Sequence, residues 1–582
     1  MEERFKVGID VGGTFTDLFL WSSTGKVGTF KVLSTPHDSS IGVIDGLEKI
    51  AESNGMDIGQ LAPRIDTIVH GTTVTTNAVL TRGGARVGLI TTNGVRDALE
   101  MRRGIREEQY NNRYQNVAPL VPRYLRQPVR GRIDYSGEEI EPLDEDDVRR
   151  ACRLMRDEGV KAVSICFMNS FANTAHERAA AEIVRSELPD AYLSVSSEVL
   201  PAIRFYNRVS TTVLNAYVGP VLSAYMRHLE DRLTEIGFGG ALLIMQSGGG
   251  VGLPELILER PAATLLSGPA AGPRAALSFT EPLGERSCLV VDMGGTSFDA
   301  SLVREGSVAL KTEGEIDRLR IAMPMLDIVT IGAGGGSIGW IDAGGLLRMG
   351  PHSAGAEPGP ACYGLGGKLP TCTDADLLLG YLDPASFAGG KLKLNPKLAL
   401  RAVDEYIAHP LGVDVDQAAA GMYRVINTNM AHGVREITIK RGLDPREFPM
   451  VVAGGAGPIH ACMIADELDI PKVVIPASAS VLCAVGMLMS DLQHDYVHSY
   501  VTPFSSLDTK RLNQLVRDMI ARGEEQLARE GVSRNERDHL VFLDLRYLKQ
   551  YHEVTVPVSR RDIEAGKVES FCNAFHAEHN RL

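Results

Sequence analysis

A short pattern that occurs twice constrains what this chain of 582 residues can fold into. The stretch GIDVGGTFTDLFL, which begins at Gly8, is matched by VVDMGGTSFDASL, which begins at Val290. Apolar, strand-like residues flank both copies, so each copy predicts two strands joined by a tight glycine turn. Five positions match, 282 residues apart: Asp10, Gly12, Gly13, Thr14 and Asp17 against Asp292, Gly294, Gly295, Thr296 and Asp299.

The residue types of the repeat suit a phosphate site. Glycines let backbone N–H groups approach phosphate oxygens closely, and the threonine hydroxyl adds a donor. An aspartate at the end of a strand can hold Mg²⁺, which neutralises phosphate charge. A plain hairpin turn is the alternative for either copy alone. The matched pair favours a two-part phosphate clamp with Asp10 and Asp292 as metal ligands.

A third glycine loop follows a strand and opens a helix in VVAGGAGPIH, residues 451–460. Its backbone can pack under an adenine ring or an α-phosphate, and simple strand-to-helix packing is the alternative. Two phosphate hairpins followed by such a loop resemble the superfamily of actin, sugar kinases and heat-shock ATPases. This resemblance implies an α/β fold with two actin/hexokinase-like (ribonuclease H-like) lobes around an ATP cleft.

The remaining pattern gives the expected organisation. We predict a first lobe over 1–200, a second lobe with glycine-rich cleft loops over 201–500, and a C-terminal α+β region over 501–582. A long amphipathic helix is expected over 209–236, and the Gly- and Pro-rich segment 327–382 is expected to be a long functional or disordered loop. The sequence stops in what resembles the middle of a helix, so we expect the native protein to continue past Leu582.

Composition excludes several classes of partner. The net charge of −13 and the pI near 5.6 argue against nucleic acid. No apolar run reaches the ~18 residues of a membrane helix, and the N-terminus lacks the features of a signal peptide. The eight cysteines form no CxxC framework, which favours reduced thiols in a cytoplasm. Pairs such as His460 with Cys462, or Cys362 with Cys372, are interpreted as core residues, because a metal site needs three or four convergent ligands.

Longer motifs narrow the family. HGTTVTTNAVL (70–80), STTVLNAYVGP (210–220), LLSGPAAGP (265–273), DIVTIGAGGGSIGWID (327–342), GPHSAGAEPGPACYG (350–364) and TDADLLLGYL (373–382) resemble the A-type subunits of the hydantoinase/oxoprolinase family. The resemblance implies an ATP- and Mg²⁺-dependent enzyme that phosphorylates the amide or enolate oxygen of a small substrate. It also implies a heteromeric complex in which a B-type subunit completes hydrolysis or carboxylation.

The resemblance also implies roles for individual residues. Asp10 and Asp292 would organise Mg²⁺ and the attacking oxygen. His70, Thr72 and Thr73 are candidates for substrate contact, and Asp327 is a candidate second acid; a core histidine and a turn cap are the respective alternatives. The residues expected to hold ATP are Gly12, Gly13, Thr14, Thr16, Asp17, Gly294, Gly295, Thr296, Gly334, Gly335, Gly454, Gly455 and Gly457.

The substrate class stays open at this stage. Family members often have E-I-R-E-Y-E-R where this chain has AIRFYNR, residues 202–208, so the subclass is in doubt. A cyclic amide hydrolase of the hydantoinase or 5-oxoprolinase type is the first expectation, and a ketone carboxylase of the acetone or acetophenone type is the second. A nucleotide-gated chaperone-like ATPase is a remote third.

Overall fold

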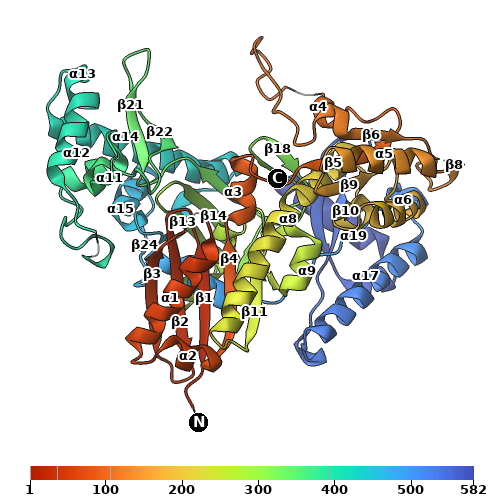
Figure 1. Cartoon of the computed structure of the whole chain (residues 1–582), viewed down its shortest axis with the longest axis horizontal. Helices are drawn as coiled ribbons and strands as arrows, with labels where there is room; N and C mark the ends of the chain where they lie inside the picture. The colour runs from red at the N-terminus through yellow and green to blue at the C-terminus, as the bar shows by residue number, and fades with distance from the viewer. Residues whose placement is uncertain (1, 36, 105, 391) are drawn as a thin grey trace. The chain divides into compact units, whose positions relative to one another are not determined.

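The computed structural model describes residues 2–35, 37–104, 106–390 and 392–582, and it has the α/β class that the sequence predicts (Figure 1). The chain forms two compact units, and both are discontinuous in sequence. The first unit consists of Met1–Gly83, Val221–Gly314 and Met323–Asp491, and the second of Gly84–Pro220, Glu315–Ala322 and Leu492–Leu582. The long helix α8 (Phe205–Glu235) crosses the division between them. The boundaries predicted for the lobes, at residues 200 and 500, stay a prediction.

The first copy of the repeat builds the central hairpin of a six-stranded sheet in the first unit. Strand β1 pairs antiparallel with β2 on one side and parallel with β4 on the other. Strand β3 extends the hairpin as a third antiparallel strand, and β11 continues the parallel side. The strand order is β12, β11, β4, β1, β2, β3, with bounds Val251–Gly252, Ala241–Met245, Ile65–Thr72, Phe5–Val11, Phe15–Ser22 and Val27–Leu33.

The second copy builds the same topology in another six-stranded sheet of the same unit. Strand β13 pairs antiparallel with β14 and parallel with β23, and β24 continues the parallel side. Strands β15 and β20 both pair antiparallel with β14, where β3 lies in the first sheet. The bounds are Cys288–Met293 for β13, Phe298–Arg304 for β14, Ser307–Val308 for β15, Ile328–Ile331 for β20, Met450–Ala453 for β23 and Val473–Val474 for β24. The repeat in sequence is therefore a repeat in fold.

Two short helices join the two sheets. Helix α16 (Leu482–Leu488) packs against β1, α10 (Gly272–Thr280) packs against β13, and the two helices pack against each other. The approach is close: a Cβ at Gly8 would lie 2.0 Å from the carbonyl oxygen of Ala484, and one at Gly486 would lie 2.0 Å from that of Ala271. Only glycine allows backbones to meet at this distance.

Each sheet also has a helical cover with its own core. Helix α1 (Ser39–Ser53) and the C-terminal half of α8 share a buried cluster with β1 and β2, in which Leu47 and Leu229 are at most 1% exposed. Helix α14 (Val415–Ile437) packs on β14 and β20 and buries Met430 and Val434 completely. The hydrophobic side chains of these faces hold the two hairpins in fixed orientations.

The segment 327–382 is more regular than the sequence predicts. It contains β20, a hairpin of β21 (Ser337–Ile341) and β22 (Leu347–Ser353), and helix α11 (Cys372–Leu378). Glycines interrupt the apolar pattern here, and the hairpin is defined by backbone hydrogen bonds rather than by alternating side chains. A capping box at Thr371 and Asp374 starts α11.

The second unit contains a parallel sheet and the C-terminal residues. The sheet has the order β10, β9, β5, β6, with bounds Tyr192–Val195, Ala162–Cys166, Val87–Thr92 and Arg126–Val129. Helices α5 (Glu145–Asp157) and α6 (Ala175–Glu187) pack together beside it. The C-terminal part is α+β, with α17 (Thr509–Arg529), the hairpin β25 (Val541–Leu545) and β26 (Val554–Val558), α18 (Arg560–Glu564) and α19 (Val568–Arg581).

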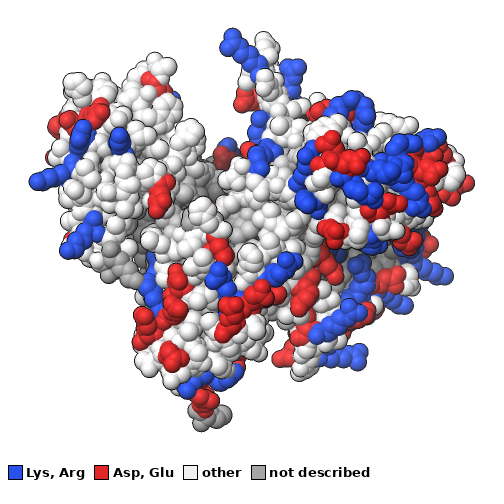
Figure 2. Space-filling view, in the orientation of Figure 1, with Lys and Arg blue, Asp and Glu red and all other residues white. Residues whose placement is uncertain are grey.

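Charged side chains of both signs lie on the surface. On the face drawn in Figure 2, basic and acidic side chains are intermixed. Within the described parts of the chain, none of the helices combines the length and the hydropathy needed to cross a bilayer.

The close contact between α16 and α10 gives a test of the packing. We expect Gly486→Ala to lower the thermal melting temperature, because the added methyl meets backbone and overpacking costs about 1–3 kcal/mol, more than the ~1 kcal/mol gained in helix propensity. Gly523→Ala is the matched control, because Gly523 lies in helix α17 and its Cβ would meet only the Tyr496 ring, at 3.5 Å. An unchanged melting temperature in Gly486→Ala would contradict the packing described here.

Candidate nucleotide and metal site

The two aspartates of each repeat lie directly opposite each other on neighbouring strands. Asp10 of β1 is the cross-strand partner of Asp17 of β2, and Asp292 of β13 is the partner of Asp299 of β14. Like charges in this arrangement repel and destabilise a hairpin. The seven-residue spacing of the two aspartates in each motif therefore creates two pairs of facing carboxylates, each near the turn of its hairpin.

The third strand of each sheet supplies a partner to the second aspartate. Lys31 of β3 is opposite Asp17, and its Nζ lies 2.5 Å from Asp17 Oδ1. In the second sheet the equivalent partner is Thr330 of β20, whose hydroxyl donates a hydrogen bond to Asp299. A cation compensates the first pair, whereas the second pair has a neutral donor in that place.

The pKa values follow from this arrangement. Burial raises the pKa of Asp292 to about 6 and that of Asp299 to about 7. Burial also raises the pKa of Asp10 well above its usual range, and the charges of Asp17 and Asp292 add to the effect. A bound cation would favour the ionised form of these carboxyl groups and offset the cost of burying their charge.

The two hairpins come together in the first unit. A Cβ at Gly295, in the second turn, would lie 3.3 Å from the Thr14 hydroxyl in the first turn. The charge of Asp292 contributes to the raised pKa of Asp10, so the two first aspartates interact across the same space. Cys483, in α16, lies between the sheets, and its Sγ donates to Asp292 Oδ2 over 3.3 Å.

Both other glycine loops pack against the second hairpin. The amides of Gly335 and Gly336 donate to the carbonyl oxygens of Gly294 and Gly295, at 3.1 and 2.7 Å. Gly454 has a φ of +84°, and a Cβ there would lie 2.5 Å from Asp292 Oδ1. The predicted Gly334, Gly335, Gly454 and Gly457 are thus gathered around the turn that carries Gly294, Gly295 and Thr296.

Three of the predicted glycines are not required by the protein's own packing. Cβ atoms built at Gly13, Gly294 and Gly455 meet nothing within 4 Å, and none of these residues has a positive φ. A Cβ at these positions would therefore not clash with the described chain. The open space beside them fits a group that approaches the backbone closely, as phosphates and nucleosides do.

The facing carboxylates, together with the glycines that have open space beside them, therefore fit a nucleotide bound with Mg²⁺. Mg²⁺ prefers carboxylate oxygens and keeps several waters or phosphate oxygens in its shell. Asp10 and Asp292, one from each hairpin, are the residues predicted to hold such an ion. Its charge would offset the repulsion within the two aspartate pairs.

The threonines predicted to contact ligand or substrate lie beside the first hairpin. Thr73 donates its hydroxyl to the carbonyl oxygen of Val11 over 3.2 Å, and the Thr72 hydroxyl accepts the amide of Val74 at 3.2 Å. Thr16 is fully buried and bonds Ser34, whose hydroxyl also donates to Gly12. Thr72 and Thr16 thus stabilise the turns of this region.

His70 is placed in the core of the first unit. Its side chain is fully buried on β4, and its Nε2 lies 2.7 Å from the Tyr225 hydroxyl of α8. Burial lowers the pKa of His70 to about 4, so the ring is neutral at ordinary pH. Its predicted role at the substrate stays a prediction.

Asp327 lies in an ion-pair cluster just before β20. Arg441 and Lys311 both pair with its carboxylate, which is 6% exposed. Two cations compensate this charge, in contrast to the aspartates of the second hairpin. Its predicted role as a second acid is likewise untested.

Three residues that complete the site were not predicted from the sequence. Lys31 and Thr330 occupy equivalent places opposite Asp17 and Asp299, but they carry no motif of their own. Lys31 lies on the strand that directly follows its hairpin, which could have been searched for such a partner, whereas Thr330 lies on β20, which is separated from the second hairpin by β15 to β19. Cys483 is brought to Asp292 by helix packing, and no sequence signal indicates it.

Comparison with protein families gives two matches that together cover most of the chain. A family described as hydantoinase/oxoprolinase matches residues 208–496, and one described as hydantoinase/oxoprolinase N-terminal region matches residues 6–188.

Two similar proteins support this assignment. The caprolactamase subunit alpha of Pseudomonas jessenii is 39% identical over 586 residues, which cover 100% of this chain and 84% of the relative. The acetophenone carboxylase gamma subunit of Aromatoleum aromaticum is 38% identical over 564 residues, 93% of this chain and 76% of the relative.

Solved structures give the same result. The crystal structure of the ATP-dependent caprolactamase from Pseudomonas jessenii has a TM-score of 0.87 at 39% identity, covering 99% of this chain and 84% of that chain. A nucleotide-free acetone carboxylase structure has a TM-score of 0.82 at 27% identity, covering 100% of this chain and 85% of that chain. The sequence motifs, the duplicated fold and these similarities agree: the chain belongs to the hydantoinase/oxoprolinase family.

Proposed function

We propose that this chain is the ATP-dependent subunit of a cyclic amide hydrolase, and that it phosphorylates the amide oxygen of a hydantoin, a 5-oxoproline or a lactam. One observation carries the proposal. The chain has two hairpins with facing aspartates, and it is 39% identical over its full length to a caprolactamase subunit. The similar crystal structure is that of an ATP-dependent caprolactamase. A B-type partner subunit and a cytoplasmic location are parts of the proposal.

The proposed chemistry is a phosphoryl transfer. The amide oxygen forms a bond to the γ-phosphorus of ATP, and the bond from that phosphorus to the β,γ-bridging oxygen breaks, which releases ADP. A water molecule in the partner's site then attacks the activated carbon, the ring C–N bond breaks with protonation of the nitrogen, and a second water molecule hydrolyses the resulting acyl phosphate to a carboxylate and inorganic phosphate. Such transfers depend mainly on positioning and on charge neutralisation.

The chain's own residues have defined parts in this scheme. Asp10 and Asp292 would hold Mg²⁺, which when bound neutralises phosphate charge. The backbone amides of the two turns would hold the β- and γ-phosphates, with the hydroxyls of Thr14 and Thr296 as further donors. The loop at Gly454, Gly455 and Gly457 would face the nucleoside, and Gly334 and Gly335 would support the second turn.

An ATP-dependent ketone carboxylase is the second candidate, favoured by the 38% identity to the acetophenone carboxylase gamma subunit. Both reactions begin with phosphorylation of an oxygen on a small molecule. They differ in their need for bicarbonate.

The substrate is tested by measuring ADP formation with hydantoins, 5-oxoproline, lactams and ketones, in the presence of the co-encoded B-type subunit and with bicarbonate varied. We expect a cyclic amide to stimulate ADP formation without bicarbonate, and ¹⁸O from its carbonyl to appear in inorganic phosphate. Asp10→Asn should lower this rate by about 10²-fold or more. Asp45→Asn, at an exposed position on α1, is the control. Stimulation by ketones alone, dependent on bicarbonate, would instead support the carboxylase.

The glycines with open space beside them give a separate test of nucleotide binding. Gly13→Val should leave the melting temperature of the ligand-free protein nearly unchanged, because a Cβ at this position would have no atom within 4 Å beyond its chain neighbours. It should weaken ATP binding by at least about tenfold, measured by calorimetry, since the side chain occupies the space proposed for phosphate. Unchanged ATP affinity would contradict the proposed cradle.

The raised pKa values predict how stability depends on pH. Without a cation, the folded chain keeps protons on Asp292 and Asp299 that an unfolded chain, with carboxyl pKa values near ~3.9, has released. The contribution of these groups to stability therefore falls as pH rises from about 4 through 7. We expect the melting temperature of Asp299→Asn to exceed that of the parent by a margin that grows between about pH 5 and about pH 8. Saturating Mg²⁺ and ATP should reduce this margin, and a margin independent of pH would contradict the assignment.

A further inference from the structure

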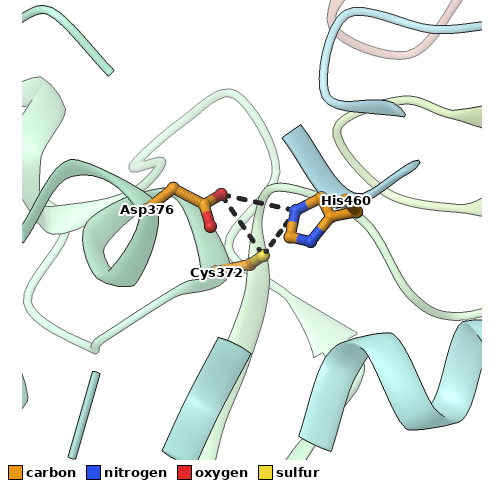
Figure 3. A group of neighbouring side chains, drawn as sticks. All are labelled: Cys372, Asp376 and His460. Atoms are coloured by element: carbon orange, nitrogen blue, oxygen red, sulfur yellow. Dashed lines mark hydrogen bonds and ion pairs between the residues drawn. The ribbon is translucent and has the colours of Figure 1, made fainter. Parts of the chain in front are cut away.

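Three side chains with metal-binding atoms converge in the interior of the first unit, outside the hairpin site (Figure 3). Cys372 Sγ, Asp376 Oδ2 and His460 Nε2 lie 3.5 Å from one another in each of the three pairs. All three side chains are buried, with at most 2% exposed.

Two helices bring these residues together. Cys372 and Asp376 are four residues apart in α11, so they lie on one face of that helix. His460 comes from the first turn of α15 (Gly457–Glu467), and α14 packs against both helices. The ring of Tyr423 in α14 stacks on the His460 imidazole with centroids 5.1 Å apart, which fixes the orientation of that ring.

The hydrogen bonding of Asp376 is incomplete. Its Oδ1 is buried and has no hydrogen-bond partner, and His460 Nδ1 is in the same condition. Among the residues that the structure describes, no lysine or arginine forms an ion pair with Asp376. A buried carboxylate without a compensating cation is costly.

The neighbouring Asp374 shows what a purely structural aspartate looks like in this helix. It is also fully buried, but its carboxylate accepts from the amides of Ala361, Cys362 and Thr371 and from the Thr371 hydroxyl. Asp374 therefore caps the helix and anchors a loop. Asp376 has no comparable set of donors, and its neighbours are a thiol and an imidazole.

The spacing and the charges fit a divalent metal ion. Zn–S distances of about 2.3 Å and Zn–N or Zn–O distances of about 2.0–2.2 Å place tetrahedral ligand atoms roughly 3.3–3.7 Å apart. A thiolate, a carboxylate and a neutral imidazole together carry the charge that one divalent cation neutralises. We propose that Cys372, Asp376 and His460 bind a zinc ion, with a fourth position left for a water molecule.

The position of the site indicates a structural role. Thr373, beside Cys372, donates its amide and its hydroxyl to the carbonyl oxygen of Gly335, both at 2.8 Å. Helix α15, which carries His460, begins at Gly457, two residues after Gly455. A metal bound here would clamp α11, which donates hydrogen bonds to the Gly335 loop, to α15, which follows the Gly454 loop, and both loops contact the second hairpin.

The test is the metal content of the purified full-length chain, measured by plasma mass spectrometry after dialysis against Zn²⁺ and removal of the excess. We expect one zinc ion per chain, and loss of this ion in Cys372→Ser and in Asp376→Asn. Cys462→Ser is the matched control, because Cys462 lies two residues from His460 on the same helix and is exposed. Equal zinc content in Cys372→Ser and Cys462→Ser would overturn the proposal.

A second measurement does not depend on whether the variants fold. A chelator should lower the melting temperature of the unmodified chain, and one equivalent of Zn²⁺, but not Mg²⁺, should restore it. Replacement by Co²⁺ should give the absorption of a thiolate bound to cobalt. The absence of both the zinc-specific recovery and the cobalt–thiolate absorption would refute the site, whatever the outcome with ATP.

Discussion

The facing of like charges across two hairpins is the constraint on which the rest of the site depends. Asp10 opposite Asp17, and Asp292 opposite Asp299, would weaken any ordinary β-hairpin. The surrounding elements hold both pairs in place: two six-stranded sheets, the helices α10 and α16 that join them, and the loops that pack on the second turn. The fold thus maintains an electrostatic arrangement that favours a cation, and the charge is less compensated in the second hairpin than in the first.

Much of this arrangement could be predicted from the repeat. Apolar residues on both sides of D-x-G-G-T-x-x-D indicate two strands and a turn, and two copies indicate two related sheets. The strand, loop and helix around Gly454 follow from local pattern as well, and the structure confirms them as β23 and α15. Local signals of this kind are reliable because the residues that cause the structure are neighbours in sequence.

Other parts depend on contacts between distant residues and gave no such signal. The hairpin of β21 and β22 was not predicted, because it lies in a segment where glycines hide the alternation and its strands are identified by their backbone pairing. Cys372 and His460 are 88 residues apart, and pairing each with its neighbour in sequence, Cys362 or Cys462, led to their interpretation as separate core residues. Lys31 and Thr330 became recognisable only when strand register placed them opposite the aspartates.

The contact between β1 and α16 also has a consequence for how the protein is made. Gly8 lies against the backbone at Ala484, so one of the first strands to leave the ribosome is packed by a helix made more than 470 residues later. At synthesis rates of about 5–20 residues per second, the delay is on the order of a minute. During that time the side of β1 that carries Gly8 lacks the helix that covers it in the folded chain, which lengthens the interval in which the nascent chain is exposed to aggregation.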